Sequence, residues 1–232
     1  MSNSIEFITI ASTGNATDFG GDLTVARRGG HSASSSTRGV FAGGFDNSDR
    51  VNTIDYMTIA STGTNAIDFG DLIQKGMDGS GYTVSSPTRG VFAGGDTPGA
   101  KVNLIQFITI STLGNAADFG DLNELRGSVA GASNATRGVF MGGFKPAAQS
   151  TIDYITISTL GNATNFGDLS TANYYNAGSA SATRAISGGG GSPFTNTIEY
   201  IEIPTTGNAV DFGDLTQKRR HLEACSNGHG GL

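Results

Sequence analysis

The triplet Asp-Phe-Gly is the first feature of this chain that suggests chemistry, because protein kinases use it to hold magnesium. It occurs four times, and Asn165-Phe166-Gly167 is a fifth version. A kinase uses the triplet once, together with a glycine-rich loop, a strand lysine and a catalytic loop, and this sequence has none of the three. Repetition therefore favours a structural role, with Phe packed between repeated units, Gly in a turn and the following Asp bound to local backbone.

Carboxylates could instead serve a glycoside hydrolase, which needs two or three of them converging about 5 to 10 Å apart. One set recurs at a fixed place in the sequence, and its members are Glu6, Asp55, Asp153 and Glu199, with Gln106 in the remaining copy. Catalytic groups are expected to depart from a repeat rather than to follow it. Glu223 is the best carboxylate of that kind, and it has no evident partner. We therefore expect no enzyme, and glycoside processing is the third alternative.

Arginine is another residue type with possible chemistry, since guanidinium groups bind anions. The triplet Thr-Arg-Gly supplies Arg38, Arg89, Arg137 and Arg184, while Gly230 occupies the fifth place and interrupts any ring of arginines. Four copies at one position favour a structural role, in which each arginine pairs with the repeated carboxylates of neighbouring strands.

Metal ligands and nucleophiles are sparse. His31, His221 and His229 lack the spacing of ligands within one element, and the Gly-Asn-Ala turns do not follow the alternating pattern of a calcium loop. Cys225, the single cysteine, cannot form an internal disulfide, and no base is placed to activate it. We expect no metal, no cofactor, and a small core residue at Cys225, because other copies have small residues such as Ala33 at its place.

Composition narrows the class of partner. The net charge of −6 and the pI of about 4.9 disfavour nucleic acid, whose phosphates repel an acidic chain. No apolar run approaches the roughly 20 residues that cross a bilayer, so we expect no membrane insertion. The N-terminal sequence MSNSIEFITI lacks the basic and apolar regions of a signal peptide, so none is expected.

All of these residues belong to a repeat that occurs five times. The copies begin near residues 5, 54, 105, 152 and 198, and the last reads IEYIEIPTTGNAVDFGDL. Units of about 50 residues stack into one body because none of them buries a core alone. We therefore expect a single domain over residues 1–232.

Within one unit the pattern is that of four short strands. Between Leu23 and Leu72, strand a is HSASSS (31–36), strand b is VFAGG (40–44), strand c is TIDYMTIA (53–60) and strand d is IDFGDL (67–72). Antiparallel meanders repeated around an axis form the blades of an all-β propeller. The chain begins with a c–d pair and ends with an a-strand at 222–227 and the start of a b-strand. We therefore expect five four-stranded blades, the closing blade combining both ends of the chain.

The unit resembles the kelch repeat of β-propellers. It shares the glycine pairs after strand b, which are Gly43-Gly44, Gly94-Gly95, Gly142-Gly143 and Gly188-Gly189, and the strand-c aromatics, which are Phe7, Tyr56, Phe107, Tyr154 and Tyr200. Strand d has Phe where kelch units have Trp, which makes this a kelch-like variant. The pattern TIDYITI…GNATDFGDL…TRGVFAGG is similar to repeats in predicted virion and tail-fibre-associated proteins of tailed, especially marine, bacteriophages. The resemblance implies a propeller fold and a phage source, and it carries no catalytic residues.

The copies disagree in two loops per unit, the b–c loop and the d–a loop, which lie on one face of an up-and-down blade. The a–b and c–d turns barely change, so one face is scaffold and the other is diversified, as in a binding surface carried on loops. The candidate ligand-binding residues on the diversified face are Arg28, His31, Tyr82, Tyr174, Tyr175, Arg220, His221 and Glu223. Further exposed residues predicted there are Arg27, Phe45, Phe144, Phe194 and Arg219.

These features predict a non-enzymatic binding module that uses its loops to hold a carbohydrate or a protein. With the resemblance, they indicate a virion or tail-fibre protein that recognises a host glycan or surface protein. It would reside on the virion, or in the host cytoplasm before assembly, as a monomer or weak oligomer. The alternative is a decoration or adaptor protein bound to another virion protein. A pocket lined by Tyr82, Tyr175, His31 and Glu223 favours ligand binding, whereas a flat polar face favours the adaptor or unconstrained drift of the loops.

Overall fold

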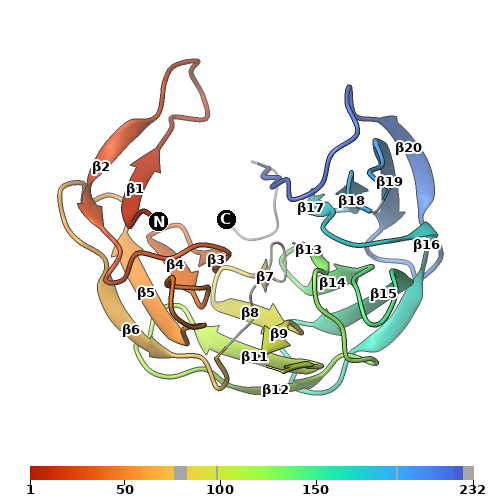
Figure 1. Ribbon diagram of the computed structural model, residues 1–232, viewed down its shortest axis with the longest axis horizontal. Coiled ribbons are helices and arrows are strands. Elements are labelled where there is room, and N and C mark those ends of the chain that lie inside the picture. Colours follow the sequence, from red (N-terminus) through yellow and green to blue (C-terminus); the bar gives the residue numbers. More distant parts are fainter. Residues whose placement is uncertain (76–82, 98, 192, 227–232) are drawn as a thin grey trace.

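The computed structural model describes residues 1–75, 83–97, 99–191 and 193–226. Within these ranges every regular element is a β-strand and no helix occurs. Strands of neighbouring units stand around a common axis in a β-propeller arrangement that is open on one side (Figure 1). The all-β propeller predicted from the repeat is therefore confirmed.

The described residues form four complete blades, each a four-stranded antiparallel meander. Blade 1 contains β3 (His31–Ser34), β4 (Arg38–Ala42), β5 (Thr53–Thr58) and β6 (Ile67–Asp71). Blade 2 contains β7 (Thr83–Ser85), β8 (Arg89–Ala93), β11 (Leu104–Thr109) and β12 (Ala117–Asp121). Blade 3 contains β13 (Ala130–Ser133), β14 (Arg137–Met141), β15 (Gln149–Thr156) and β16 (Thr164–Asn173). Blade 4 contains β17 (Ala177–Ala180), β18 (Arg184–Gly188), β19 (Thr197–Glu202) and β20 (Val210–Asp214).

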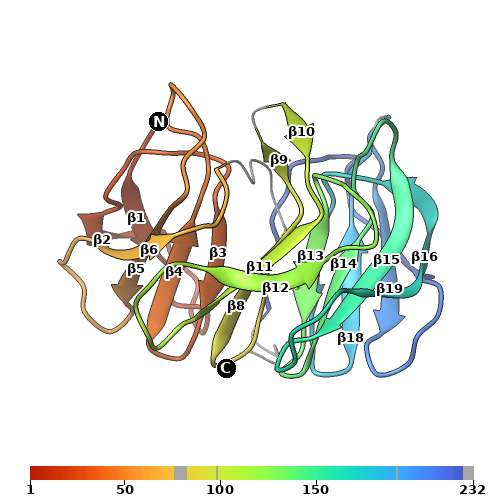
Figure 2. The same cartoon turned by 90° about the horizontal axis from the view of Figure 1, so that it is seen from below.

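Two further strand pairs lie outside these blades. The pair β1 (Ser4–Phe7) and β2 (Thr17–Asp22) forms a two-stranded sheet at one end of the arc. The short hairpin of β9 (Asp96–Thr97) and β10 (Ala100–Lys101) belongs to the b–c loop of blade 2, and Figure 2 shows it projecting from one face of the molecule.

The fifth blade differs from the prediction. Its c–d pair, β1 and β2, stands as a half-blade, and residues 222–226 carry no strand although an a-strand was predicted at 222–227. Residue 227 and the start of the final b-strand lie outside the described residues. A strand needs a ladder partner for its backbone groups, and among the described residues β1 pairs with β2 alone. The described chain thus has four complete blades and one half-blade rather than five blades.

Residues 222–226 nevertheless lie beside blade 4. The Ser226 hydroxyl donates to the carbonyl of Ala180 at 2.6 Å, and the Leu222 side chain lies over Gly189. Cys225 is exposed, so the predicted core residue is wrong. Its counterpart Ala33 is buried between blades 1 and 2, whereas no complete fifth blade packs around Cys225 in the described structure.

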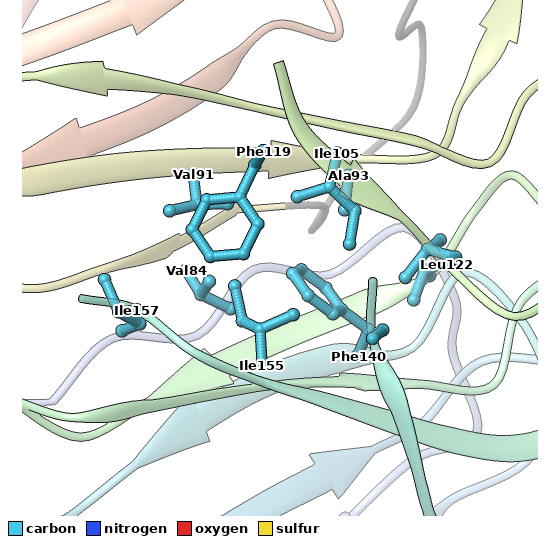
Figure 3. Packing of buried hydrophobic residues seen from close by; sticks show 11 residues of the cluster. Val84, Val91, Ala93, Ile105, Phe119, Leu122, Phe140, Ile155 and Ile157 are labelled. Atoms are coloured by element: carbon cyan, nitrogen blue, oxygen red, sulfur yellow. The ribbon is translucent and has the colours of Figure 1, made fainter. Parts of the chain in front are cut away.

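Apolar side chains gather between blades rather than within them. Figure 3 shows the cluster between blades 2 and 3, where Phe119 of blade 2 meets Ile155 and Ile157 of blade 3. The strand-d phenylalanine also packs edge to face on the strand-c aromatic of its own blade, as Phe69 does on Tyr56 with ring centroids 5.9 Å apart. Each blade therefore depends on its neighbours for burial.

A latch of three hydrogen bonds joins each strand d to the c–d turn of the next blade. Between blades 1 and 2, the Gly114 N–H donates to the Phe69 carbonyl at 2.9 Å. The Ala116 N–H donates to the Asp71 carbonyl at 2.8 Å, and the Asp71 N–H donates to Oδ1 of Asn115 at 3.0 Å. The same three bonds join blades 2 and 3, blades 3 and 4, and β2 and blade 1.

Glycine in the Asp-Phe-Gly triplet allows this close approach. Gly70 has a φ of +143°, and a Cβ there would lie 2.5 Å from the carbonyl oxygen of Gly114. The first aspartate of the triplet, Asp68, accepts a hydrogen bond from the Gly70 N–H at 3.1 Å. The triplet is structural, as the sequence predicted, although the local bond is made by the first aspartate and not by the following one.

The arginines of Thr-Arg-Gly also join neighbouring blades. Arg38 donates to the carbonyl of Ile110 in blade 2 at 2.7 Å and lies over the Tyr56 ring at 4.7 Å. Arg89 makes the equivalent contacts between blades 2 and 3, and Arg137 makes them between blades 3 and 4. The structural role is confirmed, but the partners of these three arginines are carbonyls and aromatic rings rather than the predicted carboxylates.

Candidate functional site

The two variable loops of a blade meet on one face, as the sequence predicted. In blade 3 the d–a and b–c loops exchange two backbone hydrogen bonds between Gly127 and Phe144, of 3.0 and 2.7 Å. In blade 4 the b–c loop binds both neighbouring d–a loops, because Gly191 N–H donates to the Tyr174 carbonyl and Gly190 N–H to the Arg219 carbonyl. The diversified loops of blades 3 and 4 therefore form one connected surface.

Buried ion pairs anchor two of these loops. Arg27 pairs with Asp55 at 3.0 Å and Arg126 pairs with Asp153 at 2.7 Å, and the four side chains are almost fully buried. Burial lowers the pKa of both guanidinium groups, and the partner carboxylates oppose that shift. The prediction that Arg27 is exposed is wrong, because its side chain turns inward to strand c of blade 1.

One position in the d–a loops has a left-handed backbone. It lies six residues after the leucine that ends each unit, and its φ is +65° at Gly29, +57° at Ser128, +56° at Tyr175 and +56° at His221. These residues are also linked, since Tyr175 N–H donates to the Ser128 carbonyl and His221 N–H to the Tyr175 carbonyl, each at 3.1 Å. A left-handed φ suits glycine and costs other residues about 1 kcal/mol or more.

Loop side chains form a continuous aromatic strip, which consists of Phe144, Tyr174, Tyr175, His221, Arg220 and Phe194. Ring centroids are 5.0 Å apart between Phe144 and Tyr174 and 5.1 Å apart between Tyr174 and Tyr175. The Tyr175 and His221 rings lie 3.9 Å apart with an interplanar angle of 34°. Arg220 lies over both Tyr175, at 5.8 Å, and Phe194, at 4.9 Å.

A pocket of about 520 Å³ occupies the axis beside this strip. Its charged and polar lining includes Arg28, His31 and Glu223. One residue from each of the five units also lines it at the same place in the inner segment, and these are Ser32, Thr83, Gly131, Gly178 and Ala224. Partial desolvation of its carboxyl raises the pKa of Glu223, although the residue as a whole is exposed.

The structure divides the predicted site residues between these two places. Arg28, His31 and Glu223 line the axial pocket, and the strip contains Tyr174, Tyr175, Arg220 and His221. Tyr82 lies outside the described residues. Of the three described residues of the predicted pocket, His31 and Glu223 line it and Tyr175 does not.

Sequence reasoning missed one member of this surface. Lys101 Nζ lies 5.3 Å from the centre of the Phe144 ring and pairs with Asp96 at 2.5 Å, so it extends the strip over blade 2. Its only signal in the sequence is a basic residue in a variable b–c loop.

The site's residue types restrict its chemistry. In the described part of the chain, no group of three or more His, Cys, Asp or Glu side chains is placed to hold a metal ion. Among the same residues there is no helix of the length and apolarity needed to span a membrane. The chain matches no protein-family model, and no curated protein is significantly similar to it.

Proposed function

We propose that this protein is a non-enzymatic binding module that recognises a glycan on a host surface through the aromatic strip. The observation that carries the proposal is the backbone of Tyr175 and His221. Both residues hold a left-handed φ at a position where blade 1 has Gly29. Unconstrained drift favours glycine at such a position, because glycine relieves the strain, so the aromatic side chains have a use of their own.

The chemistry of the strip suits a sugar. Aromatic rings offer flat apolar faces to the C–H groups of a pyranose, and a guanidinium donates to its hydroxyls. Arg220 lies between the Tyr175 and Phe194 rings, so both kinds of group are adjacent. Desolvation and the charge of Arg220 lower the pKa of His221, which favours the neutral form of the ring.

A second candidate is an adaptor that binds another virion protein. Phe194 favours it, since this ring is 47% exposed beside Arg220, and aromatic residues with arginine dominate the energy of protein interfaces. In both proposals the protein belongs to a phage particle or tail, and this part rests on the resemblance of the pattern TIDYITI…GNATDFGDL…TRGVFAGG to repeats of phage virion proteins. Its scaffold is a five-bladed ring whose last blade combines β1–β2 with residues 222–232, supported by the fifth repeat and by the place of Ala224 in the axial pocket.

A glycan array with the intact protein tests the first proposal. We expect binding of at least one sugar class by the native protein and by Tyr175→Phe, which keeps the ring, and loss of binding in Tyr175→Gly. Asn47→Gly is the matched control, because Asn47 is also left-handed, with φ of +85°, but is exposed in a loop outside the strip. No signal on any glycan rejects the glycan proposal, and full binding by Tyr175→Gly removes the strip as its site.

A further inference from the structure

The two ends of the open arc expose side chains whose counterparts are buried wherever two complete blades meet. Phe212 in β20 is 57% exposed, whereas its four strand-d counterparts are 2–3% exposed. At the other end, Ile8 is 62% and Ile10 is 71% exposed, while the matching Ile108 and Ile110 of blade 2 are 3% and 1% exposed. Each end therefore presents one half of an inter-blade core.

The same two ends carry the two halves of an unmade latch. On one side, β20 presents the carbonyls of Phe212 and Asp214 and the N–H of Asp214. On the other side, the turn at residues 13–16 presents the N–H groups of Gly14 and Ala16 and the side chain of Asn15. Gly213 has a φ of +139°, close to the +143° of Gly70, yet no other part of the described chain approaches its Cβ position. The strand thus has the backbone of a latched strand d without its neighbour.

A pair of matching one-residue insertions indicates that a strand d and the c–d turn docked on it fit each other in length. β2 contains an additional glycine, Gly21, and the blade 1 turn that docks on it contains an additional Thr64 directly opposite. Neither β20 nor the turn at residues 13–16 contains an insertion. The two free halves therefore match each other in length.

The charged side chains at the two ends of the arc also occupy positions whose counterparts contact each other between or within blades. Among the described residues, no next-blade carbonyl accepts from Arg184, which instead pairs with Glu202 at 2.6 Å, with both side chains half exposed. In a closed ring, the carbonyl equivalent to that of Ile110 belongs to Ile10. Glu6 and Arg219 are exposed, and they occupy the places that Asp55 and Arg27 hold in blade 1.

We propose that residues 13–16 of the chain dock on β20 of the same molecule, completing the fifth latch and closing the ring. A segment tethered to its own target acts at an effective concentration near the millimolar range, which a second copy reaches only in concentrated solution. Closure buries Phe212 against Ile8 and Ile10, and it brings Glu6 to Arg219 in the loop that carries Arg220 and His221. It deepens the proposed function by fixing the rim of the binding surface, but it requires no ligand.

Amide hydrogen exchange on the full chain, read by NMR without ligand, tests this proposal. In a solution shown by light scattering to be monomeric, we expect the Gly14, Ala16 and Asp214 amides to exchange within about tenfold of their latched counterparts Gly114, Ala116 and Asp71. Exchange of the first three amides at the rates of an open chain overturns the proposal. Protection that appears only in a dimer or larger species also overturns it, because a second copy is then the occupant.

A matched pair of variants gives an independent measurement. Asn115→Ala removes the side-chain bond of a formed latch, and Asn15→Ala removes the corresponding group of the proposed one. We expect both to lower the denaturant midpoint by similar amounts, and Asn15→Ala to speed exchange at Asp214 but not at Asp71. A midpoint and an Asp214 exchange rate unchanged by Asn15→Ala contradict closure. Because neither measurement uses a glycan, failure here is distinct from failure of the glycan proposal.

Discussion

At the scale of single residues, the most informative feature is the left-handed backbone of Tyr175 and His221, a conformation that glycine adopts more readily than other residues. The loop ladder from Ser128 through Tyr175 to His221 holds these backbones in place. Strain of this kind persists where the surrounding structure imposes it, and it concentrates at functional sites. The strip is thus positioned by the backbone before any ligand arrives.

We expect Tyr175→Gly to be more stable than Tyr175→Ala by about 1 kcal/mol, although both lose the ring. Glycine relieves the left-handed strain that alanine retains, and this outweighs its greater freedom in the unfolded chain. Urea unfolding of the two variants, followed by circular dichroism, gives the difference directly. Equal stability, or a more stable alanine variant, would show that φ at this position carries no strain.

The pKa of His221 is expected to lie below its ordinary value of 6.5, chiefly through desolvation and secondly through the charge of Arg220. Below about pH 6.5 the unfolded chain then binds more protons than the folded one, so the free energy of unfolding declines as pH falls, until folded His221 is protonated too. Arg220→Gln should raise the pKa without bringing it to 6.5, since desolvation remains. NMR titration of the ring, assigned with His221→Gln, measures this, and a pKa at or above 6.5 in the native protein contradicts it.

At the scale of elements, the buried pair of Arg126 and Asp153 ties a d–a loop to strand c of blade 3. Arg126 also donates to the Thr151 carbonyl at 2.8 Å, so its removal leaves a buried carboxylate and a carbonyl without that donor. We expect Arg126→Ala to lower the free energy of unfolding by about 3 to 5 kcal/mol. Lys75→Ala breaks the exposed pair with Asp49 and should cost no more than about 1 kcal/mol, and chemical denaturation compares the two. Similar losses in both variants would refute the anchoring role.

Sequence reasoning reached the strands and the placement of the loops because these depend on patterns within one unit. Alternation in TIDYMT and the glycine pairs define β5 and the turn after β4, and the unequal loops mark the diversified face. It failed for Arg27, because burial of that side chain depends on Asp55 in a strand 28 residues further along. It failed again for residues 222–226, since a segment becomes a strand only beside a partner. What escaped prediction is therefore the contact between distant segments.

At the scale of the whole molecule, stability resides in the interfaces between blades, as in other repeat proteins. Each core cluster of the described residues joins two neighbouring units, so at the free ends of the arc the β1–β2 half-blade and blade 4 each have a core cluster on one side only. The exposed edge of β1 is also a template for pairing with another chain. Closing the ring through residues 13–16 and β20 removes the first weakness, because both ends of the arc then have a neighbour on each side.

The few C-terminal residues should therefore contribute more to the stability of the fold than their small number suggests. A chain ending at Ser226 keeps the Ser226 bond to Ala180, the Leu222 side chain over Gly189 and Ala224 at the axis, and a chain ending at His221 loses all three. We expect the shorter chain to unfold at a lower temperature and to aggregate sooner, because blade 4 loses the segment that packs against it. Thermal unfolding with light scattering compares the two chains with the full protein, so the effect of residues 222–226 is separated from that of residues 227–232. If the two truncated chains melt together, residues 222–226 do not support the ring, and its closure then rests on the latch alone.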